Sequence, residues 1–93
     1  MTNDEILEET LEKYGDERQI RKSQEECAEL IAALNHYQED PGSTKTFNEV
    51  IEELVDVEIM LSQIKHIFLE TLGGEQIYCR YINDKFQKME CSL

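Results

Sequence analysis

The positions of glycine and proline constrain the fold of this chain more than any other feature. Its four glycines and one proline occur at only three places, Gly15, Pro41-Gly42 and Gly73-Gly74. The stretches between these breaks are rich in Glu, Leu, Lys, Gln and Ile, which favour helix. We therefore expect a single all-α domain spanning residues 1–93. The predicted helices cover residues 3–14, 16–38, 46–72 and 75–89.

The third predicted helix has the widest apolar surface. It begins at Thr46, which forms a capping-box pattern with Glu49. Its main stripe advances by alternating steps of three and four residues through Phe47, Val50, Leu54, Val57, Leu61, Ile64 and Phe68. Further apolar residues widen this arc past half of the circumference: Ile51, Val55, Ile59, Met60 and Ile67. One neighbouring helix cannot cover such an arc, so we expect this helix to be central and to contribute to an oligomer interface, most simply a two-fold dimer.

Pairs of carboxylates border the apolar stripes of the second and third helices. On an ideal wheel the stripe of the second helix consists of Ile20, Ser23, Cys27, Leu30, Ile31 and Leu34. Glu26 and Glu29 lie along its border, and Glu53 and Asp56 hold the equivalent position on the third helix. If the two helices pack side by side, these four acids surround one small volume.

Four neighbouring carboxylates repel one another unless a cation lies between them. Ligands that offer only oxygen favour a hard ion, so Mg²⁺ is the expected metal, with Mn²⁺ as an alternative. The competing interpretation is that these acids are ordinary charges on the solvated faces of helices. The occurrence of two pairs, each beside an apolar stripe, favours the metal site.

Three other polar residues are candidates for substrate contacts. Lys22 lies one turn before Glu26, where it either forms an i, i+4 ion pair or contacts substrate. Gln19 is placed to offer a hydrogen bond near the same site. Lys85 falls within the apolar side of the fourth helix, and is either a phosphate contact or a surface lysine whose stem covers apolar atoms.

Composition excludes several classes of function. The formal charge of −12, with nine scattered Lys and Arg residues, argues against binding a nucleic-acid polymer. No segment approaches the twenty apolar residues of a membrane span, and the first residues carry no leader pattern. Three cysteines without Cys-x-x-Cys spacing predict reduced thiols rather than a disulfide framework or zinc site. We expect a cytoplasmic protein that does not interact with membranes.

The arrangement of acids resembles that of the MazG-like all-α nucleoside triphosphate pyrophosphohydrolases. The family motif is Glu-x-x-Glu, a variable gap and then Glu-x-x-Asp, which here corresponds to Glu26-Cys27-Ala28-Glu29 and Glu53-Leu54-Val55-Asp56. Tyr14-Gly15 followed by Gln19 is similar to the short forms of the family. The run Asn83-Asp84-Lys85-Phe86 is similar to the Asn-x-Lys-Phe pattern that follows the third helix. The resemblance covers nearly the whole chain.

This resemblance implies a four-helix bundle that assembles into homodimers or homotetramers through the long central helix. It also implies Mg²⁺-dependent hydrolysis of a nucleoside triphosphate between its α and β phosphates. By the same resemblance, Glu26, Glu29, Glu53 and Asp56 would bind the metal, and Lys85 and Asn83 would contact phosphate or substrate. One acid would serve as the base toward water, and we assign this role to Glu29. Lys88 stands where many relatives carry arginine, and the chain has no Trp for base stacking.

Two alternatives stay open at the level of sequence. The first is an enzyme of the same fold that hydrolyses phosphoribosyl-ATP in histidine biosynthesis. The second is a non-catalytic protein, either a nucleotide sensor or an acidic helical adaptor. Neither the base and sugar preference nor the choice between dimer and tetramer follows from the sequence.

Overall fold

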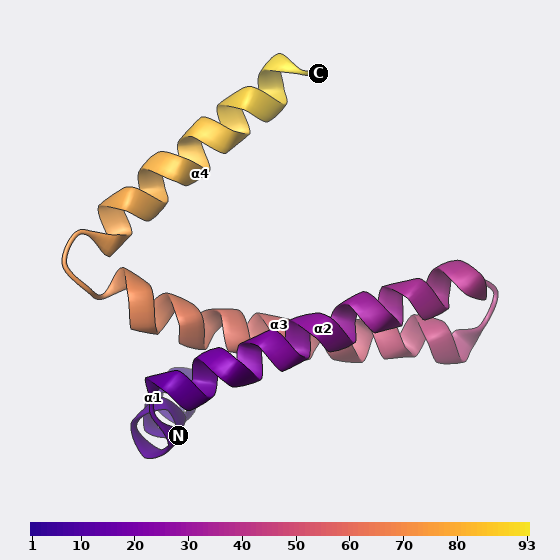
Figure 1. The fold of residues 1–93 in the computed structure, drawn as a ribbon, viewed down its shortest axis with the longest axis horizontal. Helices are drawn as coiled ribbons and strands as arrows, with labels where there is room; N and C mark the ends of the chain where they lie inside the picture. The colour runs from indigo at the N-terminus through magenta and orange to yellow at the C-terminus, as the bar shows by residue number, and fades with distance from the viewer.

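The computed structural model describes residues 1–93 and consists of four α-helices without any strand, which confirms the all-α prediction. Helices α2 and α3 run side by side as an antiparallel hairpin, α1 packs near the open end of this hairpin, and α4 projects away from it (Figure 1). None of these helices combines the length and the apolar character that crossing a bilayer requires. The bounds are Asn3–Tyr14 for α1, Asp16–Glu39 for α2, Thr44–Leu69 for α3 and Gly74–Cys91 for α4.

The ends of the helices follow local capping chemistry. At the start of α1, the Glu5 backbone N–H donates to Thr2 Oγ1 at 3.1 Å, and the Thr2 N–H donates to Glu5 Oε1 at 3.2 Å. Helix α3 begins two residues earlier than predicted because Ser43, not Thr46, is its N-cap. The Ser43 hydroxyl accepts from the Thr46 N–H at 3.3 Å. The helix ends at Leu69 instead of Leu72, and Gly73 adopts a left-handed φ of 80° before α4 begins.

The three packed helices bury only a small core, in which polar side chains are as numerous as apolar ones. The buried apolar residues are Leu11, Ala33, Val57 and Met60, and the buried polar residues are Gln19, Ser23, Glu26 and Gln63. Gln63, only 2% exposed, joins all three helices. Its Nε2 donates to the Leu7 carbonyl at 2.8 Å, while its Oε1 accepts from Gln19 Nε2 at 3.5 Å.

We expect Gln63→Ala to lower the free energy of unfolding by about 2 kcal/mol. The substitution leaves the Leu7 carbonyl and the Gln19 amide without their partner in a buried setting and opens a small cavity. Denaturant unfolding followed by circular dichroism measures the change. Gln24→Ala, on the exposed side of α2, serves as the matched control and should shift stability by no more than about 0.5 kcal/mol. Equal effects of the two substitutions would contradict this role for Gln63.

Within one chain, α2 and α3 do not pack along their widest apolar stripes, which corrects the predicted core. On α2 the buried face contains Gln19, Ser23, Glu26 and Ala33, whereas Ile31 of the predicted stripe is 62% exposed. On α3 the buried residues are Val57, Met60 and Gln63, whereas Phe68 is 53% exposed. The hairpin closes along the edge that carries small and polar side chains. As a result, the broad apolar faces of both helices are left uncovered.

Helix α4 stands apart from the other three, so a single chain does not close the predicted four-helix bundle. It contacts α3 but neither α1 nor α2, and none of its residues is buried. Near the turn, Lys65 Nζ of α3 lies 5.6 Å from the centre of the Tyr78 ring. The rest of α4 extends away, with the C-terminus distant from the hairpin (Figure 1). One side of α4 therefore exposes Tyr78, Tyr81, Ile82, Phe86 and Met89.

Candidate metal centre

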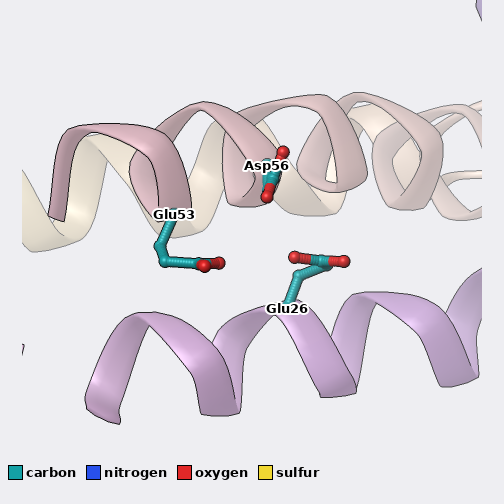
Figure 2. A group of neighbouring side chains, drawn as sticks. All are labelled: Glu26, Glu53 and Asp56. Carbon is teal, nitrogen blue, oxygen red and sulfur yellow. The ribbon is translucent and has the colours of Figure 1, made fainter. Parts of the chain in front are cut away.

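Three of the four predicted metal ligands converge in the seam between α2 and α3. Glu26 projects from α2 toward Glu53 and Asp56 of α3 (Figure 2). One carboxylate oxygen from each residue can be chosen so that all three atoms lie within 4.8 Å of one another. Glu53 and Asp56 face the seam together because they are three residues apart on a helix. We call these three residues the acidic cluster.

Burial makes the acidic cluster different from ordinary surface charge. Glu26 is buried, with 9% of its surface exposed, and Glu53 and Asp56 are half-buried. The Oε2 atoms of both Glu26 and Glu53 are buried and lack a hydrogen-bond partner. An unsatisfied buried carboxylate oxygen is costly, and like charges beside it increase that cost. The cluster therefore carries uncompensated negative charge, which a bound cation or a proton would neutralise.

Glu29 lies at the rim of the cluster and is not one of the three converging acids. Its side chain is exposed, yet it is close enough to share a hydrogen bond with the Glu53 carboxyl group. The pKa of Glu53 is raised above its ordinary value of 4.5, first by desolvation and then by the charges of Glu29 and Asp56. The shared hydrogen bond and the charge of Glu26 act in the same direction. Glu29 is thus coupled electrostatically to the cluster while it stays open to solvent.

The raised pKa of Glu53 predicts a pH dependence of stability in metal-free protein. Since the folded state binds this proton more tightly, Glu53 contributes stability below its unfolded pKa, and this contribution is lost as pH rises through the folded pKa. We expect wild type to lose stability relative to Glu53→Gln as the pH rises above the ordinary carboxyl pKa of 4.5. Urea unfolding in EDTA at several pH values measures this difference. The exposed neighbour substitution Glu52→Gln should show no such trend, and a pH-independent difference for Glu53→Gln would refute the assignment.

Lys22 is the one basic side chain that contacts the acidic cluster. Its Nζ lies 3.5 Å from Glu26 Oε1, across one turn of α2, and its side chain is 53% exposed. The predicted i, i+4 ion pair is therefore present. A single exposed lysine does not neutralise three carboxylates, because solvent screens such a pair and limits its energy to about 1 kcal/mol or less. Its ammonium group is nevertheless accessible to a ligand beside the cluster.

The other predicted substrate contacts lie elsewhere. Gln19 is 4% exposed and is hydrogen-bonded to Gln63, two turns along α2 from Glu26. Asn83 and Lys85 are exposed on α4, which has no contact with α2, so a single chain does not bring them to the cluster. Gln63 was missed by the sequence analysis. Its position in the sequence could have identified it, because Gln63 lies one turn after Met60 on the same edge of α3 as Glu53 and Asp56.

No family model, no curated protein and no solved structure matches the chain. The likeness to the MazG-like enzymes consequently stays a prediction from the sequence motifs. The site has to be interpreted from its own geometry. Three or four carboxylates without nitrogen or sulfur ligands form a donor set suited to Mg²⁺ or Mn²⁺.

Proposed function

We propose that this chain is a Mg²⁺-dependent nucleoside triphosphate pyrophosphohydrolase, which releases nucleoside monophosphate and pyrophosphate. The observation that carries the proposal is the acidic cluster, with its two buried carboxylate oxygens that lack any partner. The residues that form it belong to the Glu-x-x-Glu and Glu-x-x-Asp motifs shared with the MazG-like enzymes. A charge of −12 opposes the binding of free anions, so a phosphorylated substrate needs a local cation of this kind.

The acidic cluster, Glu29 and Lys22 would each have a separate role in the reaction. Glu26, Glu53 and Asp56 would hold Mg²⁺, with Mn²⁺ as a substitute. When bound, such an ion neutralises charge on the phosphate oxygens and lowers the pKa of coordinated water. Glu29 is exposed and close to Glu53, so it is positioned either to complete the ligand set or to accept a proton from the attacking water. We propose the second role for Glu29. The Lys22 ammonium group would contact a phosphate oxygen of the substrate.

We also propose that the active form is a homodimer or a dimer of dimers. The chain exposes 7553 Å², whereas a compact protein of 10.9 kDa exposes about 5,600 Å². Its radius of gyration is 16.3 Å, against about 12 Å for a compact chain of this length. The excess surface of roughly 2,000 Å² exceeds the ~800 Å² per partner that a standard interface buries.

The uncovered apolar faces of α2, α3 and α4 supply this interface. A second chain would cover Ile31, Leu61 and Phe68, which are exposed here. In such a dimer, α4 of one chain would lie over the hairpin of the other. Lys85 and Asn83 would then be brought to the substrate from the partner helix, which explains how residues remote from the cluster can serve it.

The test is release of pyrophosphate from a panel of canonical and modified nucleoside triphosphates, first with Mg²⁺ and then with EDTA. We expect metal-dependent formation of pyrophosphate and monophosphate in equal amounts. Release of inorganic phosphate instead would show cleavage at another bond. If no nucleoside triphosphate is hydrolysed, the proposed substrate class is wrong, and phosphoribosyl-ATP is the next substrate to assay.

A further inference from the structure

Basic residues gather where α1 turns into α2. Four of the nine Lys and Arg residues of the chain occur within residues 13–22, namely Lys13, Arg18, Arg21 and Lys22. This segment contains two acids, so its formal charge is +2. The rest of the chain has five basic and 19 acidic residues and carries a formal charge of −14. The four residues, which we call the basic patch, therefore form a positive region on a strongly acidic protein.

The side chains of the basic patch lie close together in space. Arg18, Arg21 and Lys22 line one open hollow of about 570 Å³ along the first turns of α2, and Tyr14 of α1 lines it as well. The Arg18 guanidinium lies 4.6 Å from the centre of the Tyr14 ring. Lys13 Nζ lies 5.2 Å from the same ring centre. Tyr14 thus holds two cations beside each other through cation–π contacts.

The acids in the hollow do not neutralise the basic patch. Glu17 and Glu25 both line the hollow, and Glu17 Oε1 lies 3.0 Å from Arg21 Nη2. The side chains of this ion pair are 89% and 68% exposed, so solvent and salt screen it. An anion with several charges can therefore displace Glu17 from Arg21. Lys13 and Arg18 form no ion pair with any carboxylate of the chain.

The basic patch lies on the side of α2 that is opposite to the uncovered apolar face. Lys22 and Ile31 are nine residues apart, which is about 180° around the helix, and Arg18 and Cys27 have the same separation. A second chain that covers Ile31 would approach from the other side of α2. The basic patch would therefore stay accessible in the proposed dimer.

The chemistry of the basic patch suits a diphosphate group. Guanidinium groups bind phosphate oxygens through two parallel N–H bonds, and an ammonium group adds a point charge. Arg18 and Arg21 are three residues apart on one face of α2, so their Cβ atoms are about 5–6 Å apart. Two linked phosphate groups can contact both guanidinium groups at once, whereas a single phosphate has only one centre of charge.

We propose that the basic patch is a metal-independent binding site for a diphosphate group, either inorganic pyrophosphate or the diphosphate of a nucleotide. Arg18 and Arg21 bind the phosphate oxygens, and Lys13 and Lys22 add positive charge on either side. This inference goes beyond the proposed function, because binding here requires neither a metal at the acidic cluster nor hydrolysis.

Isothermal titration calorimetry with sodium pyrophosphate, ADP and inorganic phosphate tests the basic patch. The buffer is freed of metal with a chelating resin, so that the acidic cluster repels all three anions and does not contribute. We expect wild type to bind pyrophosphate about tenfold more tightly than inorganic phosphate. Equal binding of ADP and pyrophosphate would assign the site to any diphosphate group. Much weaker binding of ADP would assign it to the free anion.

Variants of single arginines locate the bound anion. Arg18→Gln and Arg21→Gln each change an exposed side chain and should weaken pyrophosphate binding by about tenfold. Arg80→Gln removes the same charge from an exposed position on α4 and should bind pyrophosphate as wild type does. Circular dichroism verifies that all three variants are folded.

The inference is overturned if wild type binds pyrophosphate no more tightly than inorganic phosphate. It is also overturned if Arg80→Gln weakens binding as much as Arg21→Gln, because the anion would then respond only to net charge. The outcome is separate from that of the proposed function. Pyrophosphate binding by a protein that hydrolyses no nucleoside triphosphate would refute the proposed function alone, whereas Mg²⁺-dependent hydrolysis without metal-free pyrophosphate binding would refute the basic patch alone.

Discussion

Asp56→Asn should reduce the turnover of nucleoside triphosphates by about 10³-fold while leaving the helices intact. The substitution removes one of the three converging carboxylates that we propose as metal ligands. The stabilisation that a metal supplies at phosphate amounts to several kcal/mol, or about three powers of ten in rate. Asparagine retains the shape of the side chain, so packing in the seam is preserved. Without metal, the variant should be at least as stable as wild type, because one of the mutually repelling charges has been removed.

Pyrophosphate release and thermal unfolding in EDTA measure these two effects on the same samples. Glu52→Gln, which removes an exposed acid on α3, is the control and should keep wild-type turnover. Glu29→Gln separates the role proposed for Glu29 as a base from the role of a metal ligand. We expect it to lower kcat by about 10²-fold while metal still stabilises the fold. Wild-type turnover in Asp56→Asn would show that the acidic cluster is not the catalytic centre.

Leu61→Asp should dissociate the proposed dimer and lower the melting temperature by about 10 °C or more. Leu61 is 47% exposed in the single chain and lies on the uncovered apolar face of α3. A single chain buries only four apolar residues, so we expect the proposed interface to contribute most of the stability. A carboxylate at that position would be buried without a partner in the dimer.

Light scattering after size-exclusion chromatography gives the mass of wild type and variant. Gln87→Asp introduces the same charge on the polar side of α4, opposite Tyr78 and Met89, and should leave both mass and melting temperature close to wild type. A monomeric wild type with the same melting temperature as Leu61→Asp would contradict the proposed assembly. The dependence of the melting temperature on protein concentration provides a second readout, since subunit dissociation makes the melting temperature rise with concentration.

The helices were predictable because the breaks between them are chemically unambiguous. Gly15 and Gly73 adopt φ values of 85° and 80°, which other residues avoid, and both lie at helix ends. The start of α3 was misplaced because Ser43 and Thr46 both suit an N-cap and the sequence does not rank them. The end of α3 was misplaced because the apolar pattern persists through Leu72, beyond the point at which the backbone turns.

The packing faces were less predictable than the helices. Apolar width placed Ile31 in the main stripe of the second helix and Phe68 in that of the third, yet the hairpin closes along the edge that contains Ala33, Val57 and Met60. Small side chains such as Ala33 permit close approach of two helices, and a helical wheel does not represent that preference. The same edge carries Glu26, Glu53 and Asp56, so the wheel placed the acids correctly at the border. Gln63 was overlooked because a polar residue seldom occupies a core.

Thermal unfolding with and without Mn²⁺ tests the central claim, that the acidic cluster is a divalent-cation site, most directly. An ion that binds only the folded state stabilises it by about 2.7 kcal/mol at one hundred times its Kd. For a domain of this size, that corresponds to a rise in melting temperature of about 10 °C or more. We expect this rise for wild type and its loss in Asp56→Asn and Glu53→Gln. An unchanged melting temperature in wild type, or an equal rise in all three proteins, would contradict the metal centre.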